Sequence, residues 1–157
     1  MYYNDLAPCS YFGAELADKL IAVGWLDNEH PYTEGNLNDD TLDKLFELLV
    51  KPWNPMLLMG YAECGLCKID INDLTYNDKT IRVGNLNLFI PGEGFLYVMP
   101  SLAAHYILAH NYAPPQEFCD AVMRCPPMGS DDYYRAVVAN GPQRYADLIK
   151  AKYLATE

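Results

Sequence analysis

Two pairs of residues in the chain have the types and spacing of ligands for one metal ion. Cys64 and Cys67 are separated by two residues, so both sulfur atoms can face one ion from a tight turn that Gly65 eases. His105 and His110 have four residues between them, which is within the spacing of the histidine pair in zinc fingers. Zinc favours a tetrahedron of thiolate and imidazole ligands. The sequence therefore predicts a zinc site made by these four residues.

The cysteine pair alone is an ambiguous signal. Cys-x-x-Cys is also the motif of thioredoxin-like redox proteins, in which the first cysteine lies at the start of a helix. The residues after Cys67, from Lys68 to Asp73, alternate in polarity and include turn residues, which indicates a β-hairpin and favours a zinc knuckle. The alternative without a metal is that both cysteines are unmetallated, His105 is an ordinary core or surface side chain, and His110 interacts with the helix dipole.

The histidine pair needs a helix that ends at its second member. Five positions on a regular helix rotate by about 500°, so the two rings start roughly 140° apart. Asn111 and Pro114 predict a helix end directly after His110, which would allow the rings to converge. Cys119 is the residue that we expect to replace one histidine if the pair does not converge.

A site closed by four protein ligands leaves no position for water or substrate, so we expect a structural site and no catalytic residues. A zinc hydrolase with a partly open metal is the alternative. His30, Glu117 and Asp120 are potential bases, but their spacing does not single any of them out.

The chain alternates between strand-like and helix-like segments, so we expect an α+β fold in which a small antiparallel sheet with a zinc knuckle packs against several helices. The predicted strands are residues 19–26, 56–61, 81–83, 86–90 and 95–99, with a tight turn at 91–94 in the last hairpin. The predicted helices are residues 39–51 capped by Asn38 or Asp39, 102–111 capped by Ser101, 115–124, a helix opening at 130–132, and a last helix ending near 153.

The order of knuckle, hairpin and histidine-bearing helix is that of a ββα zinc finger with a long insertion. In this chain 37 residues separate Cys67 from His105, against about 12 to 15 in the compact finger. The length of 157 residues predicts one zinc-binding α+β domain over residues 1–157, with residues 126–157 as a C-terminal helical extension.

Charge and composition narrow the function. The chain carries 11 basic and 21 acidic residues, a net charge of −10, which disfavours binding to nucleic acid and suits a basic protein partner. No apolar stretch is long enough to span a membrane, and the N-terminus lacks a signal sequence, so we expect a cytoplasmic protein. Five cysteines at irregular spacing do not suggest a disulfide framework.

Two stretches resemble an uncharacterised bacterial family, a domain of unknown function. The first runs from Tyr3-Asn4-Asp5-Leu6 to Val23-Gly24-Trp25-Leu26-Asp27-Asn28-Glu29-His30-Pro31. The second runs from Gly94 through the two histidines to Tyr112-x-Pro114-Pro115-x-Glu117-Phe118, and in the family, as here, a Cys-x-x-Cys precedes it. The resemblance covers about residues 1–125 and implies no activity.

These features favour a zinc-stabilised, non-enzymatic module that binds another protein, such as an inhibitor or immunity-type protein of a basic partner. The zinc hydrolase is the second hypothesis. A zinc-finger-like regulator associated with nucleic acid is the third, and the net charge of −10 opposes it.

Overall fold

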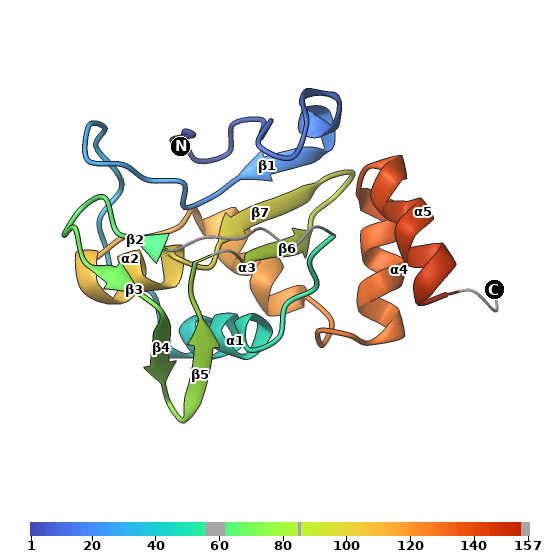
Figure 1. The fold of residues 1–157 in the computed structure, drawn as a ribbon. Coiled ribbons are helices and arrows are strands. Elements are labelled where there is room, and N and C mark those ends of the chain that lie inside the picture. Colours follow the sequence, from blue (N-terminus) through green and yellow to red (C-terminus); the bar gives the residue numbers. More distant parts are fainter. Residues whose placement is uncertain (56–61, 85, 155–157) are drawn as a thin grey trace.

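A three-stranded sheet lies at the centre of the fold (Figure 1). The computed structural model describes residues 1–55, 62–84 and 86–154. The strand order is β1 (Leu20–Ala22), β7 (Leu96–Pro100) and β6 (Asn87–Pro91). β6 and β7 form the predicted antiparallel hairpin, with Leu88 opposite Met99, whereas β1 runs parallel to β7.

The two strands of the central hairpin are buried because both of their faces are covered. Four of the five residues in each strand are buried, without the alternation of a sheet that has one exposed face. β1 is shorter than the predicted strand of residues 19–26, since Gly24 has a φ of 81° and leaves the extended conformation. Trp25 then turns inward and donates its indole N–H to the carbonyl of Val98 at 3.0 Å.

Two helices pack against each other beside this sheet. α1 (Asp39–Leu49) begins where the side chain of Asn38 accepts the N–H of Thr41, as predicted. Its apolar face, with Leu42, Leu45, Phe46 and Leu49, is buried. α3 (Gln116–Arg124) contacts α1 and follows Pro115 as predicted, and a short 3₁₀ helix, η1 (Ala14–Lys19), precedes β1.

Two small antiparallel hairpins follow α1 and precede β6 in the chain. The first pairs β2 (Ala62–Glu63) with β3 (Asp70–Ile71), and the second pairs β4 (Asp73–Tyr76) with β5 (Lys79–Arg82). The second hairpin rests on α1, where Lys79 forms an ion pair with Asp43 at 2.6 Å. The strand predicted at residues 56–61 lies outside the described residues.

α2 (Ala103–His110) carries both histidines and ends as predicted, but it begins differently. Its N-cap is Leu102, and the expectation that Ser101 caps the helix is wrong. The Ser101 hydroxyl is buried and accepts the backbone N–H of Gly84 at 3.2 Å instead.

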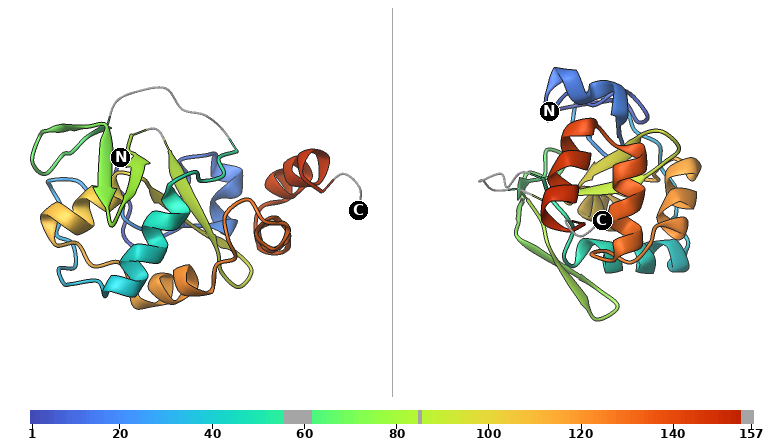
Figure 2. Two further views of the ribbon diagram at one scale, coloured as in Figure 1. Left: turned by 90° about the horizontal axis from the view of Figure 1, so that it is seen from below. Right: turned by 90° about the vertical axis from the view of Figure 1, so that its right-hand side faces the viewer.

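The last two helices, α4 (Asp131–Asn140) and α5 (Gln143–Lys152), pack against β6 at the end of the molecule opposite α2 (Figures 1 and 2). Tyr133 donates its hydroxyl to the carbonyl of Phe89 at 2.7 Å. The ring of Tyr145 meets those of Trp53 and Phe89 edge-on, at centroid distances of 5.6 Å each. The helices after residue 126 therefore complete the core around β6. Within the described ranges, none of the helices has the length and apolar character required to cross a bilayer.

Candidate metal centre

The turn between β2 and β3 has the backbone pattern of a metal-binding knuckle. The N–H of Cys64 donates to the carbonyl of Ile69 at 3.1 Å, and the N–H of Lys68 donates to the carbonyl of Cys64 at 2.7 Å. Lys68 takes a left-handed conformation with a φ of 61°, which closes the turn. The backbone N–H groups of Leu66 and Cys67 point at the Cys64 sulfur. The sulfur of Cys64 is thus fixed before any ion binds.

The second pair of candidate ligands depends on the last turn of α2. Asn111 takes the left-handed conformation with a φ of 57°, and its N–H bonds to the carbonyl of Tyr106, five residues back. The N–H of Tyr112 reaches the same carbonyl at 3.2 Å. This hydrogen bond spans five residues, whereas the backbone hydrogen bonds of a regular α-helix span four. The regular hydrogen-bond pattern of α2 therefore ends directly after His110, as the spacing of the two histidines predicts.

An earlier segment of the chain holds the end of α2 in place. Tyr32 donates its hydroxyl to the carbonyl of His110 at 2.8 Å, and the N–H of Gly35 donates to the carbonyl of Asn111 at 2.9 Å. These bonds satisfy carbonyls at the helix end, which have no partner within the helix. The position of His110 is therefore determined by contacts far apart in the sequence.

The knuckle and the end of α2 bring all four predicted ligands together. One ligand atom from each of Cys64, Cys67, His105 and His110 lies within 4.8 Å of all the others. The Cys64 sulfur is 3.3 Å from Nε2 of His110, and the Cys67 sulfur is 3.5 Å from Nε2 of His105. The two imidazole rings are almost perpendicular, with an interplanar angle of 82° and centroids 5.0 Å apart. The four residues are positioned to bind a metal ion.

Two of the sulfur–nitrogen distances fit a tetrahedral ion of the size of zinc. Bond lengths of about 2.3 Å to sulfur and about 2.0 Å to nitrogen place neighbouring ligand atoms of a tetrahedron roughly 3.3–3.8 Å apart. The two sulfur–nitrogen distances of 3.3 and 3.5 Å match that range. The donor set of two thiols and two imidazoles is also the one that such an ion prefers.

Burial shifts the pKa of two of the candidate ligands, Cys64 and His105. Loss of solvent raises the pKa of the Cys64 thiol, although hydrogen bonds from the backbone N–H groups of Cys67 and Leu66 oppose this. Burial, and then the nearby His110, lowers the pKa of His105. A neutral imidazole offers its nitrogen lone pair to a metal, and a cation stabilises the thiolate form of a coordinating cysteine.

The remaining candidates lie away from this cluster. Among the described residues the cluster contains both histidines and not Cys119, whose sulfur faces the carbonyl of Pro114 at 3.9 Å. His30 bonds to Asp27 at 2.8 Å in a local turn. Glu117 accepts a bond from the hydroxyl of Tyr97 at 3.3 Å. No sequence pattern indicates the bracing role of Tyr32, because its contact with His110 spans 78 positions.

Comparison with known proteins assigns a family. A family model described as a domain of unknown function (DUF7919) matches residues 1–123, which include the knuckle, α2 and nearly all of α3. The resemblance expected over about residues 1–125 is confirmed, and α4 and α5 lie outside the match. No curated protein and no solved structure matches the chain significantly.

Proposed function

We propose a function on the basis of the metal centre. The chain belongs to the family described as a domain of unknown function (DUF7919), and this family indicates no activity. Cys64, Cys67, His105 and His110 bind one zinc ion, and the ion fixes the knuckle to the end of α2. The observation that carries this proposal is the convergence of four ligand atoms within 4.8 Å. They come from the β2–β3 turn and from α2, and the β4–β5 and β6–β7 hairpins lie between these two segments in the chain.

The zinc acts as a structural clamp. β2 and β3 form a sheet of two strands with two residue pairs, and an isolated hairpin of that size is marginally stable in water. Figure 1 shows this hairpin beside α2. An ion bound by two thiolates and two imidazoles would supply the tie between the two elements, and binding would be coupled to their folding.

The clamp supports a non-enzymatic module that binds a protein partner. Four ligands from the chain fill a tetrahedral ion, so a zinc hydrolase would require one of them to leave. The charge of −10 favours a basic partner and opposes nucleic acid. Exposed acids lie at the start of α1 (Asp39 and Asp40) and on the second hairpin (Asp73 and Asp78), although Arg82 lies opposite Asp73 and Lys79 follows Asp78.

Elemental analysis of the purified protein tests the zinc assignment. We expect one zinc per chain in the wild-type protein. Cys64→Ser and His110→Asn should each lower the zinc content at least tenfold, because three ligands hold zinc less tightly than four. Cys119→Ser and His30→Asn are the matched controls and should retain one zinc per chain. Zinc retained in full by Cys64→Ser, or lost equally from the controls, would reject the assignment.

Affinity purification from the native host tests the proposed partner. The tagged chain should retain a basic protein at low salt and release it at high salt, because interactions between exposed charges are screened. The quadruple variant Asp39→Asn, Asp40→Asn, Asp73→Asn and Asp78→Asn keeps the metal ligands and should lose this partner. Recovery of no specific protein, or equal recovery by the variant, would argue against a basic partner.

A further inference from the structure

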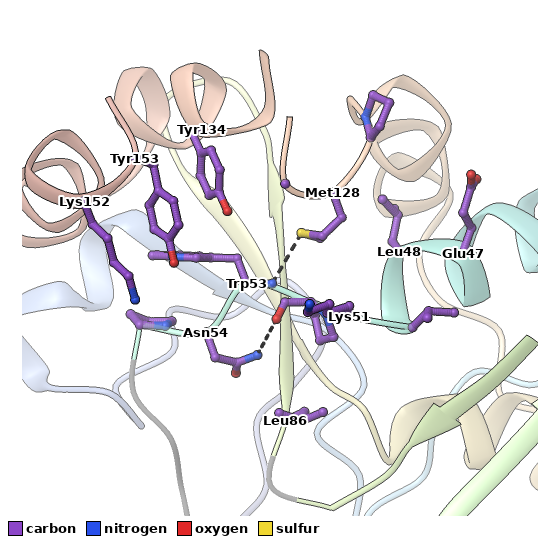
Figure 3. Close-up of a pocket in the computed structure, with 15 residues that line it drawn as sticks. Glu47, Leu48, Lys51, Trp53, Asn54, Leu86, Met128, Tyr134, Lys152 and Tyr153 are labelled. Atoms are coloured by element: carbon purple, nitrogen blue, oxygen red, sulfur yellow. Dashed lines mark hydrogen bonds between the residues drawn. The ribbon is translucent and has the colours of Figure 1, made fainter. Parts of the chain in front are cut away.

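A cavity of 810 Å³ opens between the end of α1, residues 50–55 and the C-terminal helices (Figure 3). None of the four metal ligands lines it. Its volume is in the range of sites for small molecules, which combine apolar walls with a few placed polar groups. The cavity needs an explanation of its own.

Hydrogen bonds fix the floor of the cavity. The N–H of Trp53 donates to the sulfur of Met128 at 3.3 Å, and the side-chain amide of Asn54 donates to the carbonyl of Pro52 at 3.2 Å. The amide oxygen of Asn54 accepts the N–H of Asn87 at 3.0 Å. Residues 52–54 are thus held between the start of β6 and the segment before α4, so the cavity is preformed.

One end of the cavity presents hydrogen-bond donors. The rings of Tyr134 and Tyr153 are stacked, with centroids 4.2 Å apart and an angle of 12° between them. Figure 3 shows both hydroxyls directed towards Trp53, with Lys152 beside Tyr153. The Lys152 ammonium lies 5.4 Å from the centre of the Tyr153 ring, which restrains it. Burial, and then the neighbouring Tyr153 through its charge and a hydrogen bond, raises the pKa of Tyr134, whose hydroxyl therefore stays protonated.

The charges around the cavity differ in sign from those of the whole chain. Among the described residues, two lysines, Lys51 and Lys152, and one acid, Glu47, line it, in a chain of 11 basic and 21 acidic residues. Glu47 and Leu48 lie at the end of the cavity away from Lys152 in Figure 3. No ion pair joins either lysine to a carboxylate of residues 1–55, 62–84 or 86–154. An anion would therefore be attracted to the end formed by Lys152.

We propose that this cavity binds a small apolar carboxylate, a ring or short chain that carries one acid group. The carboxylate accepts hydrogen bonds from Lys152 and from the hydroxyls of Tyr134 and Tyr153. The apolar body lies against Met128 and Leu48. Lys152 and both tyrosines lie after residue 123, outside the family match, so this segment adds a ligand site to the family domain.

Isothermal titration calorimetry of the full-length, metal-loaded protein tests this proposal. The probes are 6-phenylhexanoate and its neutral amide, 6-phenylhexanamide, which differ only at the acid group. We expect the acid to bind at least tenfold more tightly than the amide. Lys152→Met should weaken binding of the acid about tenfold and leave the amide unchanged, because it removes one cation and keeps the length of the side chain.

Lys150→Met is the matched control. Lys150 is exposed on the same helix and does not line the cavity, so this variant should bind both probes as the wild-type protein does. Absence of binding by the acid, equal affinity for acid and amide, or equal losses from the two lysine variants would overturn the proposal. None of these results depends on zinc content, so a failure here is distinguishable from a failure of the metal assignment.

Discussion

At the residue scale, Cys64 combines a side-chain role with a backbone role. It supplies a sulfur to the cluster, and its backbone N–H and carbonyl close the knuckle through Ile69 and Lys68. It is fully buried, whereas Cys67 is half-buried. The identity of the four ligands was predictable, because short spacings such as Cys-x-x-Cys are readable in one sequence. The brace from Tyr32 was not, since no sequence pattern marks a contact between distant side chains.

The other cysteines should behave as inert core residues. Burial raises the pKa of Cys119 to about 11 and that of Cys125 to about 12. The thiolate is the reactive form, and a raised pKa means that it forms only at higher pH. At pH 8 about one Cys119 thiol in a thousand is ionised. We predict that iodoacetamide leaves both residues unmodified in the native protein at pH 8, as measured by peptide mass spectrometry.

The control for this experiment is the same reaction in denaturant, where both cysteines should be modified fully. Cys64 and Cys67 should become reactive in the native protein only after a chelator has removed the metal. Rapid modification of Cys119 or Cys125 in the native state at pH 8 would contradict this account of their burial.

At the element scale, each segment follows its local pattern until a distant contact offers a better partner. The helix over residues 39–49 follows from its cap and apolar spacing, and the β6–β7 hairpin follows from its turn. Ser101 was predicted to cap α2, but its hydroxyl bonds to Gly84, which local sequence does not reveal. β1 stops early because Gly24 packs closely: a Cβ there would lie 2.7 Å from that of Ala103.

The end of α2 should depend on the conformation of Asn111. Its φ of 57° suits glycine and asparagine, and it costs a β-branched residue about 1–2 kcal/mol. We predict that Asn111→Gly changes the free energy of unfolding little, whereas Asn111→Val lowers it by about 1–2 kcal/mol and also weakens metal binding. Urea denaturation and competition with a zinc chelator measure the two effects.

A cap on another helix provides the comparison for Asn111→Val. Asn38→Ala removes the side-chain bond to the N–H of Thr41 and should lower the free energy of unfolding by about 1 kcal/mol. Asn38 lies at the start of α1, so the zinc affinity of the Asn38→Ala variant should equal that of the wild-type protein. Equal weakening of zinc binding by both variants would show that the end of α2 has no special role.

At the scale of the whole molecule, the two ends of the central sheet carry different sites. The metal centre lies at the end with α2 and the knuckle, and the cavity lies at the end with α4 and α5 (Figure 1). The α+β class could be predicted from the alternation of segments. The parallel pairing of β1 with β7 could not, because the paired residues Leu20 and Leu96 lie 76 positions apart in the chain.

The C-terminal helices should be needed for the stability of the whole chain, as a single domain over residues 1–157 requires. Removal of residues 126–157 would expose the surfaces of Phe89 and Trp53 that Tyr133 and Tyr145 cover. We predict that the shortened chain melts at a lower temperature than the full chain in circular dichroism. An unchanged Tm would mean that residues 1–125 fold independently and that the extension is a separate unit.

Tyr133→Phe is a milder test of the same contact. It keeps the ring and removes the bond to the carbonyl of Phe89, leaving a buried carbonyl with one partner fewer. We expect the free energy of unfolding to fall by about 1–3 kcal/mol, with no change in zinc content.

The central claim is that one zinc ion is closed by two sulfur and two nitrogen atoms from this chain. X-ray absorption at the zinc edge measures that coordination shell directly. The account predicts two sulfur atoms at about 2.3 Å and two nitrogen atoms at about 2.0 Å. A purified protein without zinc, or a shell in which an oxygen atom replaces one of the four ligands, would contradict it.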